Sequence, residues 1–240
     1  MPREHGAMNA GMNILVIDIG GSSVKLHGPE DIATNFSTPV SMDPAGMMRR
    51  ISDATRNIDY DHVSIGYPGP VHNGRLLREP VNLGRGWTRF NFNKAFNCPV
   101  RIINDAAMQA LGSYKGGIML FIGLGTGLGT TLIHDGHIVP MELAHLPFME
   151  NRTFEQLLGQ HGLETCGTEI WKIHVAMAIN MFMYSLCPEY IVLGGGNARL
   201  FTADEMPAHT IHGNNSNAYT GGIRLWEPDY VCYSPATQET

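Results

Sequence analysis

The sequence has little positive charge, few charged residues of either sign and no long apolar run. Of its 240 residues, 16 are Lys or Arg and 22 are Asp or Glu, which gives a formal net charge of −6. A general binder of nucleic acid or of an anionic membrane needs a dense basic field, which is missing here. No segment approaches the roughly 20 apolar residues of a transmembrane helix, and the first residues lack the apolar core of a secretory signal. We therefore expect a cytoplasmic protein whose partners include neither nucleic acid nor membrane.

Cysteine is scarce and scattered. The four positions are Cys98, Cys166, Cys187 and Cys232. No C-x-x-C pair is present, so neither a zinc ribbon nor a dithiol redox motif is expected. His145 and His161 do not combine with Cys166 in a standard ligand spacing, and no zinc is expected. Free thiols in a reducing compartment are the simplest interpretation.

Glycine, by contrast, is abundant, and short apolar runs alternate with helical patterns. Strands are predicted at residues 13–19, 23–27, 62–67, 99–103, 117–123, 129–134, 137–139 and 190–193. Helices are predicted at residues 43–57, 91–96, 106–114 and 168–186. This order indicates an α/β protein, and the length allows two lobes around a shared cleft. Three of the apolar strands end in polar or glycine-rich turns, which is where α/β sheets bind ligands.

The first such turn follows the strand at residues 13–19. Asp18 at the strand end is suited to hold a hydrated Mg²⁺. Gly20 and Gly21 let backbone N–H groups approach a phosphate, Ser22 adds a hydroxyl donor and Lys25 adds a point charge. The alternative is a plain Gly-Gly hairpin turn.

A second glycine-rich turn, at residues 123–129, contains Gly125, Thr126 and Gly127. Its backbone forms a concavity suited to phosphate oxygens. It does not fit the dinucleotide fingerprint, because β-prone residues follow where that motif needs a helix. A loose hairpin is the alternative.

Asn104 and Asp105 end the strand predicted at residues 99–103. Asp105 is placed to accept a hydroxyl proton while Asn104 positions a sugar. The alternative is a helix N-cap for the helix that follows, and both can hold, with Asn104 as the cap.

Two further groups carry polar or glycine residues. Glu142 and His145 share a face if their turn is helical, and they would bind adjacent sugar hydroxyls or form an ordinary acid–imidazole pair. Gly194, Gly195 and Asn197 follow the strand at residues 190–193 and would let a nucleoside or a phosphate chain lie on the backbone. The alternative there is a flexible joint. Together the five turns describe a phosphoryl-transfer cleft.

The order of these motifs resembles the ROK family of sugar kinases, within the actin/hexokinase-like phosphotransferases. The resemblance rests on six segments: Asp18-Ile-Gly-Gly-Ser, Gly66-Tyr-Pro-Gly-Pro-Val71, Asn104-Asp-Ala106, Leu124-Gly-Thr-Gly-Leu-Gly129, Glu142-Leu-Ala-His145 and Leu193-Gly-Gly-Gly-Asn197. The chain is most similar to the polyphosphate glucokinase branch, in segments such as His145-Leu-Pro-Phe148 and Arg152-Thr-Phe-Glu155.

The resemblance implies a role for each matching residue. Glucose hydroxyls would be bound by Asn104, Asp105, Glu142, His145 and Glu155, with Asp105 also the general base for the 6-hydroxyl. Asp18 would organise Mg²⁺ through water. The phosphoryl donor, polyphosphate or ATP or both, would lie on Gly20, Gly21, Ser22, Lys25, Gly125, Thr126, Gly127, Gly194, Gly195 and Asn197.

The same resemblance implies a two-lobed, ribonuclease H-like fold with a central cleft. Residues 1–105 would form the first lobe, with residues 1–12 a disordered extension, and residues 106–240 the second, whose last helix packs back on the first. A homodimer is also implied.

Other functions stay open at this stage. Ala107 and Ala144 depart from the usual pattern of the branch, and they motivate a kinase for fructose, mannose or an N-acetylhexosamine. A non-catalytic sugar-binding protein on the same scaffold is the remaining alternative. A polyphosphate donor would favour a basic track, for which Arg152, Arg199 and Arg224 are the candidates.

Overall fold

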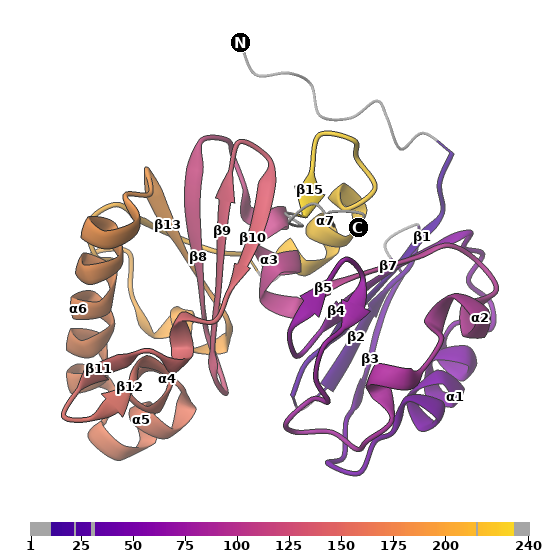
Figure 1. The fold of residues 1–240 in the computed structure, drawn as a ribbon, viewed down its shortest axis with the longest axis horizontal. Helices are drawn as coiled ribbons and strands as arrows, with labels where there is room; N and C mark the ends of the chain where they lie inside the picture. Colours follow the sequence, from indigo (N-terminus) through magenta and orange to yellow (C-terminus); the bar gives the residue numbers. More distant parts are fainter. Residues whose placement is uncertain (1–10, 22, 30–31, 215, 233–240) are drawn as a thin grey trace, which may run out of the picture.

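Two β-sheets, with a helical layer between them, organise the fold (Figure 1). The computed structural model describes residues 11–21, 23–29, 32–214 and 216–232. The mixed α/β class is the one that the sequence predicts. The first ten residues of the expected extension lie outside the described residues.

The first sheet has five strands in the order β3-β2-β1-β4-β7. Their bounds are β1 Ile14–Ile19, β2 Ser23–His27, β3 Ala33–Ser37, β4 His62–Tyr67 and β7 Val100–Asn104. The first three form an antiparallel meander, whereas β1, β4 and β7 run parallel. Because parallel strands are covered on both faces, β1 is apolar and buried along its whole length.

Two helices cover the outer face of this sheet: α1 (Pro44–Ala54) and α2 (Phe92–Phe96). Asp43 caps α1 by accepting a hydrogen bond from the backbone N–H of Gly46 at 2.6 Å, and Pro44 occupies the first helical position. Asn91 caps α2 in the same way through the N–H of Lys94. The start of α1 is placed as predicted and α2 starts one residue later than predicted, whereas α1 ends three residues before its predicted end at residue 57.

The second sheet has six strands in the order β14-β13-β8-β9-β10-β15. Their bounds are β8 Ile118–Leu124, β9 Leu128–His134, β10 His137–Met141, β13 Tyr190–Gly194, β14 Thr210–His212 and β15 Val231–Cys232. Strands β8, β9 and β10 form an antiparallel meander, and β13 adds to β8 in parallel. The glycine-rich segment at residues 123–129 is thus the β8–β9 hairpin, as the sequence predicts.

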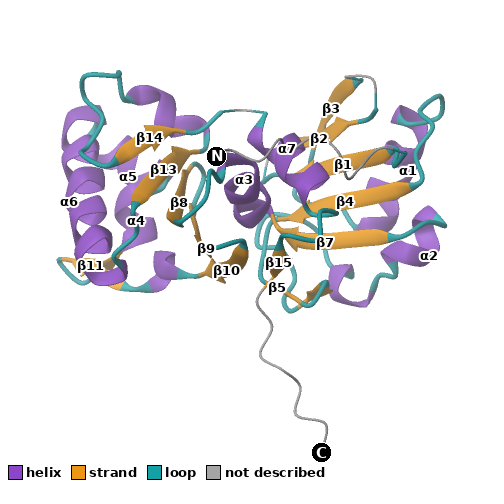
Figure 2. Cartoon of the chain, turned by 90° about the horizontal axis from the view of Figure 1, so that it is seen from above, coloured by secondary structure: helices purple, strands orange, loops and turns teal. Residues whose placement is uncertain are grey.

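A pair of helices lies between the two sheets (Figure 2): α3 (Asp105–Ser113) and α7 (Asn217–Arg224). Side chains alternate along a strand, so one face of β8 packs Met119 and Phe121 on this layer. Helix α7 also contacts β1 and β4, and Ser64 donates a 2.6 Å hydrogen bond to the carbonyl of Gly222. The lobe boundary after residue 105 stays a prediction.

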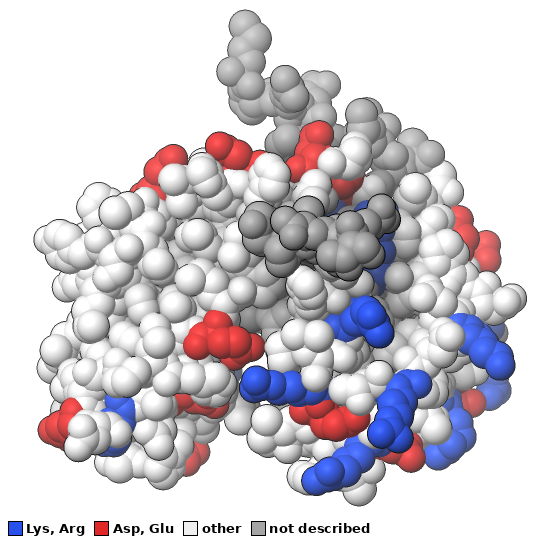
Figure 3. Space-filling model, in the orientation of Figure 1, with Lys and Arg blue, Asp and Glu red and all other residues white. Residues whose placement is uncertain are grey.

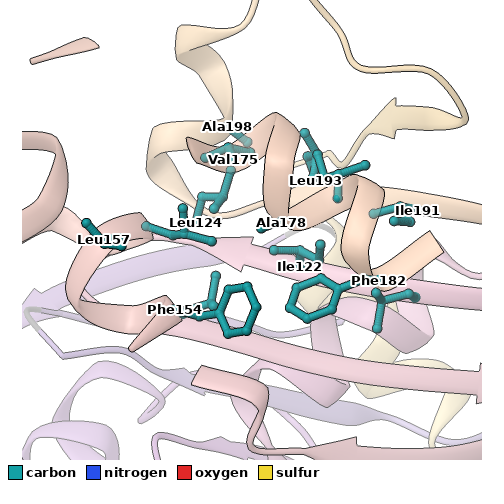
Figure 4. Close-up of a cluster of buried hydrophobic side chains, with 14 of the residues drawn as sticks. Ile122, Leu124, Phe154, Leu157, Val175, Ala178, Phe182, Ile191, Leu193 and Ala198 are labelled. Carbon is teal, nitrogen blue, oxygen red and sulfur yellow. The ribbon is translucent and has the colours of Figure 1, made fainter. Parts of the chain in front are cut away.

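The other face of the second sheet packs against α4 (Phe154–Leu158), α5 (Gln160–Cys166) and α6 (Thr168–Leu186). Figure 4 shows Ile122 and Leu124 of β8 beside Phe154, Val175 and Phe182 of these helices. The bounds of α6 are those predicted. Its opposite face leaves a row of apolar side chains exposed: Ile170, Ile173, Met177, Met181 and Tyr184.

Short elements complete the chain. They are β5 Val71–His72, β6 Arg75–Leu76, η1 Trp87–Arg89, η2 Leu143–His145, β11 Pro147–Met149, β12 Arg152–Thr153 and η3 Gly196–Leu200. None of the helices in the described ranges is long and apolar enough to cross a bilayer. Cys98, Cys166 and Cys187 are free thiols.

Candidate active site

A cavity of about 660 Å³ opens between the two halves of the fold and collects many of the residues singled out in the sequence. Its volume is in the range of small-molecule sites. The lining includes the following predicted site residues: Gly21, Asn104, Asp105, Gly125, Thr126, Gly127, Glu142, His145, Glu155 and Gly195. Most of them come from strand ends and turns of the two sheets, and Glu155 comes from α4.

Asn104 and Asp105 stand where β7 passes into α3. The Asn104 carboxamide oxygen accepts the N–H of Ala107 at 3.1 Å, which caps the helix, and its Nδ2 donates to the carbonyl of Gly69 at 3.2 Å. Asp105 therefore occupies the first helical turn, where its Oδ1 accepts the N–H of Ala106 at 2.8 Å. The cap predicted for Asn104 is confirmed, and the cap places the Asp105 carboxyl group in the cavity.

Replacing Asn104 with alanine should lower the free energy of unfolding by about 1 kcal/mol, because the first turn of α3 loses its side-chain acceptor. Urea unfolding would measure this. Asn104→Ser is the matched control, since a serine hydroxyl caps a helix almost as well. Equal losses in the two variants would show that the cap is not the cause.

The carboxyl group of Asp105 is shielded from solvent on most sides. Burial, with the neighbouring charges of Asp18 and Glu142 adding to it, raises its pKa from 3.8 to about 7, although the N–H of Ala106 opposes the shift. A carboxyl group with a pKa near neutrality is matched to general-base catalysis at physiological pH.

Asp18 lies at the end of β1, with only 6% of its surface exposed. Burial raises its pKa, and Lys25, whose Nζ is 3.9 Å from the carboxylate, partly opposes this. Neither Asp18, Gly20 nor Lys25 lines the cavity, and Ser22 is outside the described residues. In the parts of the chain that the structure describes, no three His, Cys, Asp or Glu side chains form a group that could hold a metal ion. Asp18 is nevertheless close enough to Asp105 to add to the raised pKa of that carboxyl group, and such a pair suits a hydrated cation, which needs only one or two carboxylates.

Both glycine-rich turns contribute residues to the lining of the cavity. The N–H of Gly20 donates to the carbonyl of Ser23 at 2.9 Å, which closes the β1–β2 turn. In the β8–β9 turn the N–H of Gly125 donates to the carbonyl of Gly127 at 3.1 Å. A Cβ atom on Gly127 would come within 2.9 Å of Glu155 Oε1, so only glycine leaves that carboxylate in place.

Glu142, His145 and Glu155 form a cluster on the opposite wall. His145 Nε2 is 3.6 Å from Glu142 Oε2, and His145 Nδ1 is 3.8 Å from Glu155 Oε2. The helical turn predicted for Glu142 and His145 is the 3₁₀ turn η2. Ala144 within it does not adopt the left-handed backbone that would require glycine. The two carboxylates offer hydrogen-bond acceptors and the imidazole offers a donor. The cluster can therefore bind a ligand with several hydroxyl groups.

Of the three residues predicted in the turn after β13, only one lines the cavity. Gly195 lines the cavity with a φ of 81°, and a Cβ atom there would overlap the carbonyl of Leu124. Gly194 packs on Phe121, outside the cavity. Asn197 is turned to α5, where its Nδ2 donates to Gln160 Oε1 at 2.9 Å.

The remaining wall comes from the loop between β4 and α2, whose side chains the sequence motifs did not single out. It contributes Arg78, Glu79 and Asn82. The glycine and prolines that stop β4 at residues 68–70 signal the loop, but nothing in the local pattern shows that it folds back on the cleft.

Comparisons with known proteins agree with this architecture. The model of the family described as "ROK family" matches residues 16–140. The polyphosphate glucokinase of Mycobacterium leprae is 25% identical over 207 residues, which cover 76% of this chain and 63% of that protein. The polyphosphate glucokinase of Mycobacterium tuberculosis is 24% identical over 206 residues, 76% of this chain and 77% of that protein. The chain thus spans less than two thirds of the length of the first of these relatives.

Solved structures show the same fold. The inorganic polyphosphate/ATP-glucomannokinase from Arthrobacter sp. strain KM superposes with a TM-score of 0.76 at 21% identity, covering 90% of this chain and 98% of that one. A glucokinase from Streptomyces griseus, in complex with glucose and AMPPNP, superposes with a TM-score of 0.68 at 16% identity, covering 89% and 98%. The fold is therefore the actin/hexokinase-like fold that the sequence predicts.

Proposed function

Since the chain belongs to the ROK family, we propose that it is a sugar kinase that transfers a phosphoryl group to the 6-hydroxyl of glucose. One observation carries this proposal most directly. Asp105, whose pKa is raised to about 7, lies in one cavity with a glycine-rich backbone turn and with the Glu142–His145–Glu155 cluster. A base, a phosphate-binding surface and sugar-binding groups are the parts that phosphoryl transfer to an alcohol needs.

In this mechanism the sugar lies between Asn104 and the Glu142–His145–Glu155 cluster, which bind its hydroxyls. Asp105 accepts the proton of the 6-hydroxyl as the O6–P bond forms. The bond between the transferred phosphorus and the bridging oxygen of the donor breaks, and the electron pair leaves with the donor. The base contributes about 10²–10⁴-fold to the rate.

The donor phosphates would lie on backbone N–H groups of Gly21, Thr126 and Gly127, since the N–H of Gly125 is bonded within the turn, with Gly195 at the border of the donor site. The donor is polyphosphate, ATP or both. The relatives named polyphosphate glucokinases support the first, and the structural neighbour named for both donors supports the pair.

Mg²⁺ fits this site, and Asp18 would hold it through water, together with the donor phosphates. The bound ion would offset the charge of Asp18, which adds to burial in raising the pKa of Asp105. It would also neutralise the charge on the donor phosphates.

Mannose is a second candidate acceptor, because the structural neighbour with a TM-score of 0.76 is named a glucomannokinase. A panel of glucose, mannose, fructose and N-acetylglucosamine, each with ATP or polyphosphate and Mg²⁺, would test acceptor and donor together. We expect turnover with glucose and at least one donor. Sugar binding without turnover from either donor would instead indicate a non-catalytic sugar-binding protein.

A further inference from the structure

Four arginines belong to the loop that lines the cavity on the side of the first sheet. This segment, residues 71–90, is called the arginine loop here. It contains four exposed arginines, Arg75, Arg78, Arg85 and Arg89, and only one acidic residue, Glu79.

Glu79 is occupied within the loop. Its two carboxylate oxygens accept the backbone N–H groups of residues 86–88 at 2.9–3.3 Å and the hydroxyl of Thr88 at 2.7 Å. The bond from Thr88, together with those backbone N–H groups, lowers the pKa of Glu79. These bonds tie the chain beside Arg78 to the chain beside Arg85 and Arg89.

The four guanidinium groups have no ion pair and no hydrogen bond to any residue that the structure describes. Other arginines of the protein differ in this respect. Arg152 pairs with Glu150 at 2.5 Å, and Arg56 pairs with Asp53 at 2.8 Å. Arg224 donates to the carbonyls of Leu111 and Tyr114. Two members of the track expected from Arg152, Arg199 and Arg224 thus have partners within the chain.

The arginine loop reaches the cavity and the first glycine-rich turn. Arg78 lines the cavity itself. Asn82 Nδ2 lies 3.5 Å from the position that a Cβ atom on Gly21 would take, so the loop packs against the backbone proposed to bind the donor. An anion bound in the cavity would thus have the free guanidinium group of Arg78 beside it.

The opposite half of the protein does not offer such a surface. Residues 106–240 carry five Lys or Arg and twelve Asp or Glu. Figure 3 shows this division on one face, where blue side chains gather over the half of the first sheet and only one blue patch appears over the other half. A long anion that leaves the cavity is repelled by one half and attracted by the other.

We infer that the arginine loop holds the distal phosphates of a polyphosphate chain whose terminal phosphate reacts in the cavity. This inference rests on the proposed function and names the donor class of that site. Arginine binds phosphate through two parallel N–H groups, and each further phosphate of the chain adds a negative charge for it. The loop would therefore select donors by length, because a longer chain presents more phosphates to the four arginines than ATP or tripolyphosphate does.

The double variant Arg75→Ala/Arg85→Ala tests the inference, since neither side chain lines the cavity. The KM for long-chain polyphosphate should rise about tenfold or more, as expected for loss of charge-assisted hydrogen bonds. The KM values for ATP, tripolyphosphate and glucose should change less than about twofold, because the cavity is intact. Arg56→Ala is the matched control: it removes an exposed arginine of the same half that is paired with Asp53.

Three results would overturn the inference. The first is an unchanged KM for long-chain polyphosphate, with glucose turnover intact, which leaves the proposed function standing. The second is a rise in the KM for the sugar instead, which assigns the loop to the acceptor. If the wild type turns over no donor, the proposed function fails, and the loop is then tested by calorimetric titration with long-chain polyphosphate. The third result that would overturn the inference is an equal affinity of the wild type and the double variant for that polyphosphate.

Discussion

Asp105→Asn is expected to lower kcat by about 10²–10⁴-fold, because asparagine keeps the shape of the side chain but cannot accept the proton of the sugar hydroxyl. The wild-type kcat/KM should rise with pH up to about 7 and then level off, as the carboxyl group, whose pKa is raised to that value, loses its proton. The variant should lack this rise. Steady-state rates between pH 5 and pH 9 would measure both effects.

The same variant should fold and should resist unfolding better than the wild type above pH 7. A raised pKa means that the folded state favours protonated Asp105, so the contribution of this group to stability is complete well below pH 4 and is lost as the pH rises to about 7. Asparagine is neutral throughout and avoids that loss. Asp59→Asn, at an exposed position outside the cavity, is the control for both measurements. Full activity of Asp105→Asn would refute the role of Asp105 as base.

Gly112→Ala is expected to lower the free energy of unfolding by about 3 kcal/mol or more, despite the higher helix propensity of alanine. Helices α3 and α7 touch at this point: a Cβ atom on Gly112 would overlap the carbonyl of Asn217 and lie 2.8 Å from the backbone nitrogen of Gly221. Backbone atoms cannot rotate away, so the helices must separate, and overpacking of this kind outweighs the roughly 1 kcal/mol that alanine gains over glycine in a helix. Urea unfolding would measure the loss.

The α3–α7 contact also bears on activity, because α3 carries Asp105 in its first turn. Displacement of α3 should lower kcat in whatever fraction of Gly112→Ala remains folded. Gly196→Ala is the control for stability, since a Cβ atom there meets nothing within 4 Å and its φ is ordinary. Equal stability of Gly112→Ala and Gly196→Ala would contradict the close packing of the two helices.

The parts of the fold that could be predicted are those whose signal is local. Buried strands such as β1 and β4 are apolar runs closed by glycine or proline, and α6 has a long apolar pattern that starts and ends where predicted. Strand β3 was missed because its residues alternate only between exposed and half-buried positions. Helices α4 and α5 were missed because they are too short to show a helical period.

In the candidate site, too, the residues that could be predicted are those with a local signal in the sequence. Asn104 and Asp105 were found because they directly follow a strand, and their double role as cap and cavity residue follows from that position. The arginine loop was not found, because its approach to Gly21 joins segments about sixty residues apart through the contact of Asn82 rather than through any local pattern. Lys25 and Asn197 are near in sequence to cavity residues, yet one faces Asp18 and the other faces α5.

Identification of the phosphorylated product by ³¹P NMR tests most directly whether this cleft transfers a phosphoryl group to the 6-hydroxyl of glucose. With glucose, Mg²⁺ and either polyphosphate or ATP, the wild type should produce glucose 6-phosphate, and Asp105→Asn should produce almost none in the same time. No phosphate ester from either donor, or equal product from wild type and Asp105→Asn, would contradict the proposed activity or its base.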